Sequence, residues 1–393
     1  MNFKNITNCL CCLNKNRLLL NLGTFPLANN FKSKGSFEES YPLQLMICDN
    51  CYHCQLKYIV NPEILFKDYK YLSGTSNTGL DFFKKNAINI NNTFLKPGKV
   101  LDIACNDGSQ LNFFKELNWE TYGVDPAENL YNLNSGHTIY CSFWNESVSK
   151  KLPIMDLIIA QNVFAHTKDI DLFLINCKSL LHSGSSLFIQ TSQKNMIANG
   201  EFDTIYHEHI SFFNTKSMGI LVSRNGLFLN NVTIADIHGE SYIFEINLLP
   251  KPGNTNEFKI QEKELYSPEI YNVFATNAYK MVNNLKTEIG FYKIQGYTAI
   301  GFGAAAKGQT VLCYGNISLE LIIDENPLKI GTFSPKMNIP VISLDSAKNI
   351  KFDKLLIVIL AWNFADEIIM KIKDLQFSEI VIIKKYFPEI VKV

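Results

Sequence analysis

The chain has 393 residues, of which 47% are hydrophobic and 19% are charged, a composition typical of folded globular proteins. The 37 Lys and Arg residues equal the 37 Asp and Glu residues, and this balance argues against non-specific binding to nucleic acid. No apolar run reaches the ~18 residues that span a bilayer, and the start of the chain lacks a signal-peptide core. We therefore expect a cytoplasmic protein with reduced cysteines and two or three domains.

Cysteines are concentrated at the start of the chain, where six of the ten fall within the first 54 residues. Two C-x-x-C pairs, Cys9 with Cys12 and Cys48 with Cys51, predict a site in which four thiolates surround one zinc ion. Such a closed set leaves no position for water, so the ion would be structural. Cys51 and Cys54 form another C-x-x-C, so the second pair could shift by three residues; we favour Cys48 and Cys51 because 55–59 is typical of a strand. A cluster of buried free thiols is the other reading.

The segment 99–125 predicts a strand, a turn, a helix at 109–117 and a second strand that ends in an acid. That acid, Asp125, lies about twenty residues past the turn, where α/β proteins hold a ribose diol. The turn is poorer in glycine than a dinucleotide fingerprint, which favours an adenosyl ligand without phosphates. The candidate cofactor-binding residues here are Asp102, Asn106, Asp107, Gly108 and Asp125.

Two further strands are expected at 156–161 and 186–191, and the alternation of strands and helices predicts a mostly parallel sheet. Asn162 and His166 follow the first of these strands, at the edge where open α/β sheets bind ligands. Downstream, residues 206–209 read Tyr-His-Glu-His, a cluster that can titrate near neutral pH and transfer protons. A surface loop or a metal site is the plainer interpretation, and spacing alone does not distinguish the two histidines.

The segment 298–308 predicts a strand, a glycine-rich turn and a helix start, and strands are expected again at 319–324 and 354–360. This pattern indicates a second Rossmann-like unit, a diverged copy of the first. Backbone N–H groups near Gly303 and Gly308, with the charge of Lys307, could hold an anion. Alternatively, the glycines only allow close packing of strand and helix.

Taken together, these motifs resemble the S-adenosylmethionine-dependent sugar C-methyltransferase family, whose members methylate a carbon of a nucleotide-linked keto-sugar. The matching segments run in family order: the two cysteine pairs, 41–43, 68–73, 101–108, 161–166, 206–209 and 303–308. The chain departs from the family at 238–243, where a basic residue is lost and Glu240 is gained, and at Gln309 and Cys313, where asparagines are usual. These departures leave the identity of the sugar and nucleotide open.

The resemblance implies an α/β protein with a zinc-binding lid domain (1–75), a class I, Rossmann-like methyltransferase domain (76–245) and a C-terminal Rossmann-like domain that helps hold the nucleotide-sugar (246–393). It implies S-adenosylmethionine and structural Zn²⁺ as cofactors and a nucleotide-linked keto-sugar as substrate. From charge and composition we expect no nucleic-acid or membrane partner, and we expect a monomer or weak oligomer. His209 is the implied base, with Glu208 supporting its imidazole. Tyr206, His166 and Tyr71 would contact the sugar, Tyr71 from the lid; Asn162 would contact the cofactor, and His207, Gly303, Lys307 and Gly308 the substrate.

Two rival functions remain open from the sequence. An NAD-dependent sugar oxidoreductase or epimerase would use the same scaffold, but the first α/β unit lacks G-x-x-G-x-x-G and Tyr-x-x-x-Lys. A zinc-bearing binding protein with an inactive methyltransferase domain is the second, and the intact 206–209 cluster counts against it.

Overall fold

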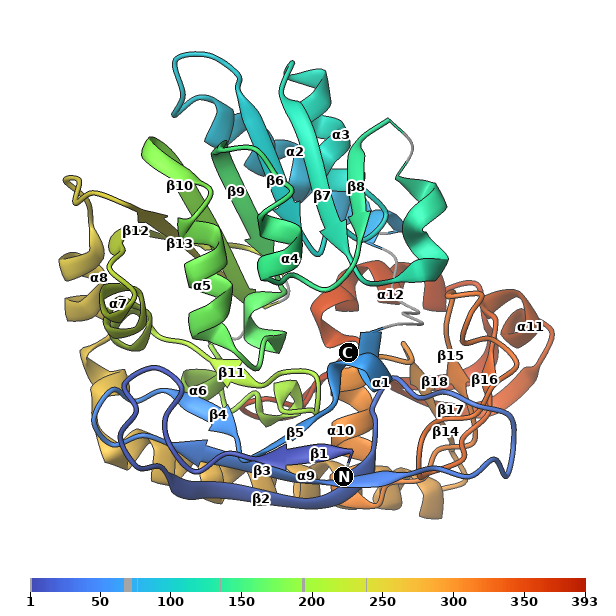
Figure 1. The fold of residues 1–393 in the computed structure, drawn as a ribbon. Helices are drawn as coiled ribbons and strands as arrows, with labels where there is room; N and C mark the ends of the chain where they lie inside the picture. Colours follow the sequence, from blue (N-terminus) through green and yellow to red (C-terminus); the bar gives the residue numbers. More distant parts are fainter. Residues whose placement is uncertain (1, 67–72, 76, 135, 193–194, 238) are drawn as a thin grey trace. The chain divides into compact units, whose positions relative to one another are not determined.

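The computed structural model describes residues 2–66, 73–75, 77–134, 136–192, 195–237 and 239–393 (Figure 1). The chain forms two compact units: 1–17, 46–194 and 210–266 make the first, and 18–45, 195–209 and 267–393 make the second. Each unit is therefore assembled from three separate segments. The three consecutive domains expected from the sequence remain a prediction. Within the described ranges, no helix is long and apolar enough to cross a membrane.

The first unit is built on a seven-stranded sheet. Its strands are, in spatial order, β8 (Thr138–Cys141), β7 (Glu120–Asp125), β6 (Lys99–Ile103), β9 (Met155–Gln161), β10 (Leu181–Ser192), β13 (Ser241–Asn247) and β12 (Phe228–Ala235) (Figure 1). Strands β6 to β10 are parallel, whereas β13 runs antiparallel to both of its neighbours. The central strands are continuous apolar runs because both faces of a parallel sheet are covered. The expected mostly parallel sheet is confirmed, with the strand order and directions of a class I methyltransferase.

Helices and short strands complete the first unit. The α-helices are α1 (Pro62–Phe66), α2 (Asn77–Asn91), α3 (Ser109–Glu116), α4 (Glu146–Ser149), α5 (Ile170–Lys178), α7 (Thr215–Arg224) and α8 (Thr255–Gln261). The 3₁₀ helices are η1 (Ser73–Thr75), η2 (Glu128–Leu133), η3 (Phe164–His166) and η5 (Lys263–Tyr266). Near the N-terminus, β1 (Phe3–Asn5) pairs with β5 (Tyr58–Val60), and β4 (Cys54–Leu56) pairs with β11 (Ser211–Phe212), both antiparallel.

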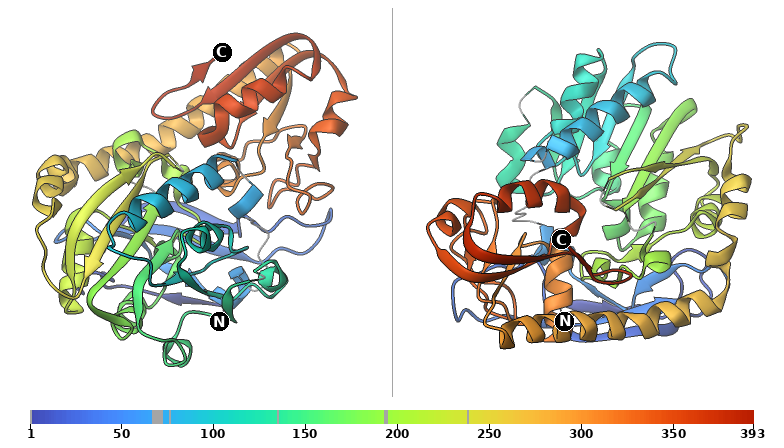
Figure 2. Two further views of the ribbon diagram at one scale, coloured as in Figure 1. Left: turned by 90° about the horizontal axis from the view of Figure 1, so that it is seen from above. Right: turned by 180° about the vertical axis from the view of Figure 1, so that it is seen from behind.

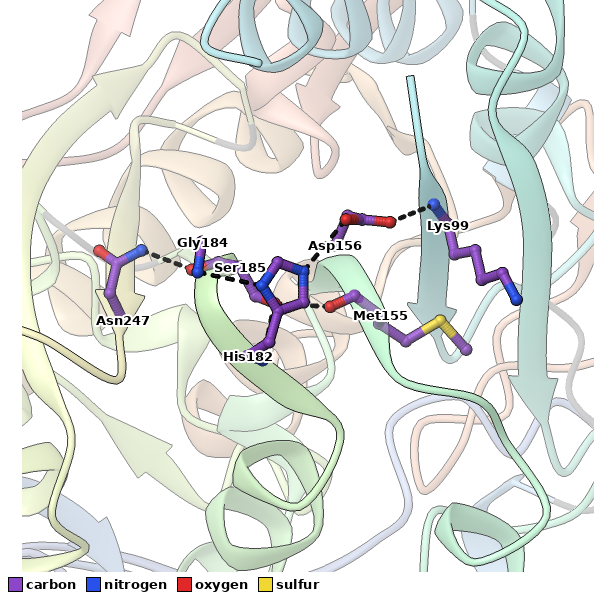
Figure 3. A network of polar contacts seen from close by, with 7 residues as sticks. All are labelled: Lys99, Met155, Asp156, His182, Gly184, Ser185 and Asn247. Carbon is purple, nitrogen blue, oxygen red and sulfur yellow. Dashed lines mark hydrogen bonds and ion pairs between the residues drawn. The ribbon is translucent and has the colours of Figure 1, made fainter. Parts of the chain in front are cut away.

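Asp156 ties three strands of this sheet together at their amino ends (Figure 3). Its carboxylate accepts the Lys99 N–H at 2.8 Å and the ring Nε2–H of His182 at 3.1 Å. The Gly184 N–H donates to His182 Nδ1 at 3.0 Å, so the neutral ring carries its proton on Nε2. The register of β10 against β9 shifts just after Leu181, and these bonds satisfy the polar groups of that bulge. The network is structural, because ligands of such sheets bind at the opposite, carboxyl edge.

The second unit has a six-stranded sheet. Its spatial order is β16 (Val341–Ile342), β15 (Ile322–Ile323), β14 (Thr298–Phe302), β17 (Lys351–Ile359), β18 (Gln376–Lys385) and β19 (Val391–Lys392). All neighbours are parallel except β18 and β19. This is the 3-2-1-4-5-6 order of dinucleotide-binding folds. The expectation of a second Rossmann-like α/β unit is therefore confirmed.

One long helix, α9 (Pro268–Ile294), precedes this sheet and is seen along its length in the right panel of Figure 2. It begins at Ser267, whose hydroxyl accepts the Glu269 N–H, and Pro268 occupies the first turn, where its missing N–H costs nothing. The unit also has α6 (Met196–Asn199), η4 (Phe202–Thr204), α10 (Ala306–Gly315), α11 (Leu344–Lys348), η6 (Trp362–Phe364) and α12 (Ala365–Ile372). Most of β2 (Arg17–Pro26) and β3 (Ser40–Ile47) belongs to it as well, but Arg17, Met46 and Ile47 are assigned to the first unit.

Candidate functional site

Four cysteine sulfurs of the first unit form a metal-binding cluster. The Sγ atoms of Cys9, Cys12, Cys48 and Cys51 all lie within 4.8 Å of one another. Cys9 and Cys51 are 3.5 Å apart, and Cys12 and Cys48 are 3.3 Å apart. Tetrahedral zinc with Zn–S bonds of about 2.3 Å requires sulfur separations near 3.8 Å, so the four thiolates fit zinc. Cys54 lies outside this cluster, so the second pair is Cys48 and Cys51.

Both arginines of the chain hold the loops that carry these cysteines. Arg17 Nε donates to both carboxylate oxygens of Asp49, at 2.9 and 3.0 Å. Arg224 Nη2 donates to the Leu10 carbonyl at 2.9 Å, and the Leu10 N–H donates to Gln55 Oε1 at 2.8 Å. Each guanidinium group thus fixes one of the two cysteine loops through its hydrogen bonds. Sequence reasoning missed this role. The signal was that these are the two arginines of a chain whose other Lys and Arg positions are all lysine.

The loop after β6 is held by the acid at the end of β7. Asp125 Oδ2 accepts the Asn106 N–H at 2.9 Å, and Oδ1 accepts the Ala127 N–H at 2.8 Å. Ala104 and Asn106 both have positive φ, at 64° and 52°. Backbone strain of this kind concentrates where a loop must face a ligand. The spacing that singled out Asp125 from the sequence thus corresponds to a direct contact with the loop.

The side chains of Asn106 and Asp107 hold a neighbouring turn. Asn106 Oδ1 accepts the Ser73 N–H at 3.0 Å, and Asp107 Oδ2 accepts the Gly74 N–H at 2.8 Å. Gly108 caps α3 with φ of 75°, and a Cβ there would lie 2.5 Å from Asn134 Oδ1. Only glycine therefore fits this position without strain.

The carboxyl edge of this sheet gathers acidic and polar side chains that suit a positively charged ligand. Burial raises the pKa of Asp102, and the neighbouring charges of Asp125 and Asp107 raise it further. A ligand with an ammonium and a sulfonium group would relieve that repulsion. Among the described residues, several buried polar atoms at the carboxyl ends of β9 and β10 have no hydrogen-bond partner: Gln161 Oε1, Asn162 Oδ1, both polar atoms of Gln190, and Thr191 Oγ1. Sequence reasoning found Asn162 and missed the other three, although all four follow the carboxyl-edge rule.

His166 ends the short helix η3 after β9, and its ring lies edge-on to Phe66 at 5.9 Å. Burial lowers the pKa of His166 to about 4, so the imidazole is neutral at pH 7. A neutral ring still donates one N–H hydrogen bond. Tyr71 and its neighbour Tyr69 fall outside the described residues.

In the second unit, Tyr206 and His209 meet across a turn closed by the His209 N–H to Tyr206 carbonyl bond of 2.9 Å. The Tyr206 hydroxyl lies 2.8 Å from His209 Nε2, with the ring centroids 4.1 Å apart. His209 Nδ1 lies 2.7 Å from the Thr204 carbonyl oxygen. A carbonyl only accepts, so Nδ1 carries the proton, and the lone pair on Nε2 accepts from the phenol. Residues 206–209 thus form a turn.

The other two residues of the cluster have structural contacts in the same unit. His207 is buried, and its Nε2 lies 3.1 Å from the Tyr41 carbonyl oxygen. Glu208 Oε1 accepts from Asn29 Nδ2 at 2.6 Å. The resemblance implied that Glu208 supports the imidazole of His209, but the Thr204 carbonyl oxygen lies at Nδ1. Thr204 was missed because a backbone carbonyl carries no sequence signal.

The glycine-rich turn after β14 has a packing explanation. A Cβ on Gly308 would lie 2.5 Å from Leu360 Cβ, and one on Gly303, whose φ is 90°, would overlap Ala361. Lys307 Nζ lies 4.5 Å from the centre of the Trp362 ring. The glycines therefore allow close approach of α10 to the end of β17, as the alternative interpretation held.

Three family descriptions match successive parts of the chain. A zinc binding domain matches 9–66, a methyltransferase domain matches 81–231, and a C-methyltransferase C-terminal domain matches 255–383. The C-methyltransferase NovU of Streptomyces niveus is 27% identical over 394 residues, covering 94% of this chain and 93% of that protein. The mitochondrial ubiquinone biosynthesis O-methyltransferase of Rattus norvegicus is 24% identical over 112 residues, 25% of this chain and 32% of that protein. A methyltransferase structure from Archaeoglobus fulgidus shares 15% identity, covers 43% of this chain and 94% of its own, and has a TM-score of 0.36, too low to add to the fold.

The sheet order and these matches define an enzyme that uses S-adenosylmethionine, a class I methyltransferase. The four-cysteine cluster adds a zinc-binding domain to it. More specifically, the chain is similar over 94% of its length to a C-methyltransferase, and it carries the zinc binding, methyltransferase and C-methyltransferase C-terminal matches in that order.

Proposed function

We propose that the enzyme methylates a carbon next to the ketone of a nucleotide-linked keto-sugar. The ketone acidifies the neighbouring C–H, His209 takes that proton on Nε2, and the resulting enolate carbon accepts the methyl group. S-adenosylmethionine, when bound, supplies the electrophilic methyl group and leaves as S-adenosylhomocysteine. Asp102, Asn106, Asp107, Gly108, Asp125 and Asn162 are the residues that we assign to holding it.

The observation that carries the proposal is the state of His209. Its Nδ1–H is committed to the Thr204 carbonyl, so the neutral ring presents a basic lone pair on Nε2. His207 has the mirror-image arrangement, with Nε2–H on the Tyr41 carbonyl, but burial lowers its pKa to about 4, which makes it a poor base. The structure thus favours His209 over His207 as the base, a choice that spacing left open.

Tyr206 is assigned to the oxygen of the substrate as well as to the base. Its hydroxyl donates to Nε2 at 2.8 Å. Once Nε2 takes the substrate proton, the imidazolium becomes a donor there, and the phenol is released to donate to the enolate oxygen. His166 and Tyr71 are the other proposed sugar contacts, and a water-poor pocket would favour a step in which charges on carbon and sulfur cancel.

The C-terminal unit is proposed to help hold the nucleotide-linked substrate through Lys307, with Gly303 and Gly308 shaping the turn. Glu208 keeps a supporting role, because its bond to Asn29 fixes the backbone between the two histidines. The domain match to a C-methyltransferase C-terminal domain supports carbon as the methylated atom.

The test is solvent exchange. Wild type incubated with a nucleotide-linked keto-sugar and S-adenosylhomocysteine in heavy water should incorporate deuterium at the acidic carbon, read by mass spectrometry. His209→Ala should lose exchange while calorimetry shows retained S-adenosylhomocysteine binding, and His207→Gln should keep exchange. Undiminished exchange in His209→Ala removes this residue as the base. Tight binding of NAD with no binding of S-adenosylhomocysteine would favour an oxidoreductase instead.

A further inference from the structure

The carbonyl that holds His209 belongs to a short turn, η4 (Phe202–Thr204), within the second unit. Because Thr204 sets the proton on Nδ1, the orientation of this turn decides whether Nε2 is basic. All three residues of the turn are buried. What fixes the turn therefore also fixes the tautomer of His209.

Asp203, at the centre of the turn, is bonded to a tryptophan of the C-terminal sheet. Its side chain is fully buried, and Oδ2 accepts the Trp362 Nε1–H at 2.7 Å. Phe202 lies edge-on to Phe387, with ring centroids 5.4 Å apart. The Thr310 hydroxyl donates to the Ile205 carbonyl at 3.4 Å. The chain is thus held before Asp203 through Phe202 and after it through Ile205.

These anchors come from one edge of the sheet. Thr310 lies on α10 after β14, Trp362 follows β17, and Phe387 follows β18. The three strands are parallel, so the anchors gather at their carboxyl ends. That edge, between β14 and β17, is where the strand order reverses and where such folds bind ligands. In this protein, part of the edge is occupied by the turn that holds His209.

Charge around the indole supports a strong bond to Asp203. Lys307 and Lys385 lie over the Trp362 ring, with Nζ 4.5 and 5.2 Å from its centre. Cations over an aromatic face draw electron density toward themselves, which makes the indole N–H a better donor. Burial raises the pKa of Asp203 to about 6, against the lowering effects of Lys307 and the Trp362 bond.

We propose that Trp362 is a positioning residue for His209: its indole N–H fixes Asp203, and with it the Thr204 carbonyl that keeps the imidazole proton on Nδ1. The inference rests on the proposed role of His209 as the base. Trp362 itself takes no part in proton or methyl transfer. Replacing Trp362 should therefore change the tautomer of His209 while the fold is kept.

The direct test is ¹⁵N NMR of histidine-labelled protein, which reports the tautomer without any substrate. Wild type should show His209 as the Nδ1–H form, and Trp362→Phe should show a mixture of both tautomers. Trp119→Phe is the matched control, because it also loses a buried indole bond, the 2.9 Å bond to Asn91, within the first unit. It should leave the His209 signal unchanged.

A pair of Asp203 variants separates hydrogen bonding from charge and stands in if Trp362→Phe does not fold. Asp203→Asn keeps an oxygen that accepts from Trp362, so it should keep the Nδ1–H signal. Asp203→Leu removes the acceptor and should lose it. Equal spectra for the two variants, or a wild-type spectrum for folded Trp362→Phe, overturns the proposal.

Kinetics adds a second readout. Trp362→Phe should lower kcat by about 10- to 100-fold, the effect of a misaligned reacting group, and leave the KM for S-adenosylmethionine within twofold. An unchanged kcat with an altered tautomer would show that His209 is not the base, which contradicts the proposed function and leaves the positioning role standing. An unchanged tautomer with a lowered kcat contradicts the positioning role alone.

Discussion

Asp125 and Asp324 hold the loops of their respective units with the same pair of hydrogen bonds. Asp125 accepts from the N–H of Asn106 and from the N–H two residues ahead, at 2.9 and 2.8 Å. Asp324 accepts from the N–H of Ala304 and from the N–H two residues ahead, at 2.5 and 2.7 Å. The acids follow the first-loop residue by 19 and 20 positions. This correspondence supports the view that the two Rossmann-like units are diverged copies.

Replacing these acids should separate their roles. Asp125→Asn leaves one oxygen where the carboxylate has two, so one backbone bond is lost and the strained cofactor loop relaxes. We expect S-adenosylhomocysteine to bind at least about tenfold more weakly, ~1.4 kcal/mol, by calorimetry. Asp324→Asn, the matched control, should bind it within twofold of wild type. Equal losses in both variants would contradict the assignment.

Tyr206→Phe should impair turnover without unfolding the protein. The phenyl ring keeps the contact with the His209 ring, but the donor at Nε2 is lost. We expect kcat to fall about 10²-fold, as for loss of one donor to a developing oxyanion, with little change in cofactor affinity. Steady-state kinetics and calorimetry check this. A full rate in the variant would remove the phenol from the mechanism.

Two buried neutral histidines should make the fold sensitive to acid. Burial lowers the pKa of His207 and of His166 to about 4. Between pH 4 and their unfolded value near 6.5, the unfolded chain binds more protons, so stability rises with pH across this window. The contribution is complete above about pH 6.5 and is lost toward pH 4, roughly 3 kcal/mol for His207. Urea unfolding at pH 7 and pH 5 should show a flatter dependence for His207→Gln.

Metal content should follow the four-thiolate cluster. Cys48→Ser should bind less than one zinc per chain and melt at a lower temperature, because the ion's binding energy contributes to folding. Cys54→Ser, which changes the cysteine three residues after Cys51, should keep one zinc per chain. Elemental analysis with thermal melting decides between them. Loss of zinc in Cys54→Ser alone would place the second pair at Cys51 and Cys54.

The glycines of the second unit should differ in their tolerance of alanine. Gly308→Ala forces a Cβ to within 2.5 Å of Leu360 Cβ, and overpacking of this kind costs about 1–3 kcal/mol. Gly290 lies inside α9, and a Cβ there would have no neighbour within 4 Å among the described residues, so Gly290→Ala should stabilise by up to ~1 kcal/mol. Urea unfolding measures both changes.

The sequence predicted what depends on local pattern and spacing. The sequence pointed to the four cysteines because they form two C-x-x-C pairs: Cys9, Cys12, Cys48 and Cys51. It pointed to Asp125 through the spacing of the βαβ repeat. Trp362 and Thr204 were missed, because one acts through a contact 159 residues away along the chain and the other through a backbone carbonyl. Nor does spacing reveal that Glu208 bonds Asn29, a partner 179 residues away. The catalytic and cofactor roles themselves remain predictions.

The passage of residues 195–209 into the second unit constrains how this enzyme can be recombined with its relatives. A chimera joined once, near residue 245, would exchange the sheet that carries Trp362 and leave Asp203 with a foreign partner. Productive crossovers would have to move three stretches of polypeptide together. Among related sequences, the residues at positions 203 and 362 should therefore covary more strongly than either does with its neighbours in the chain.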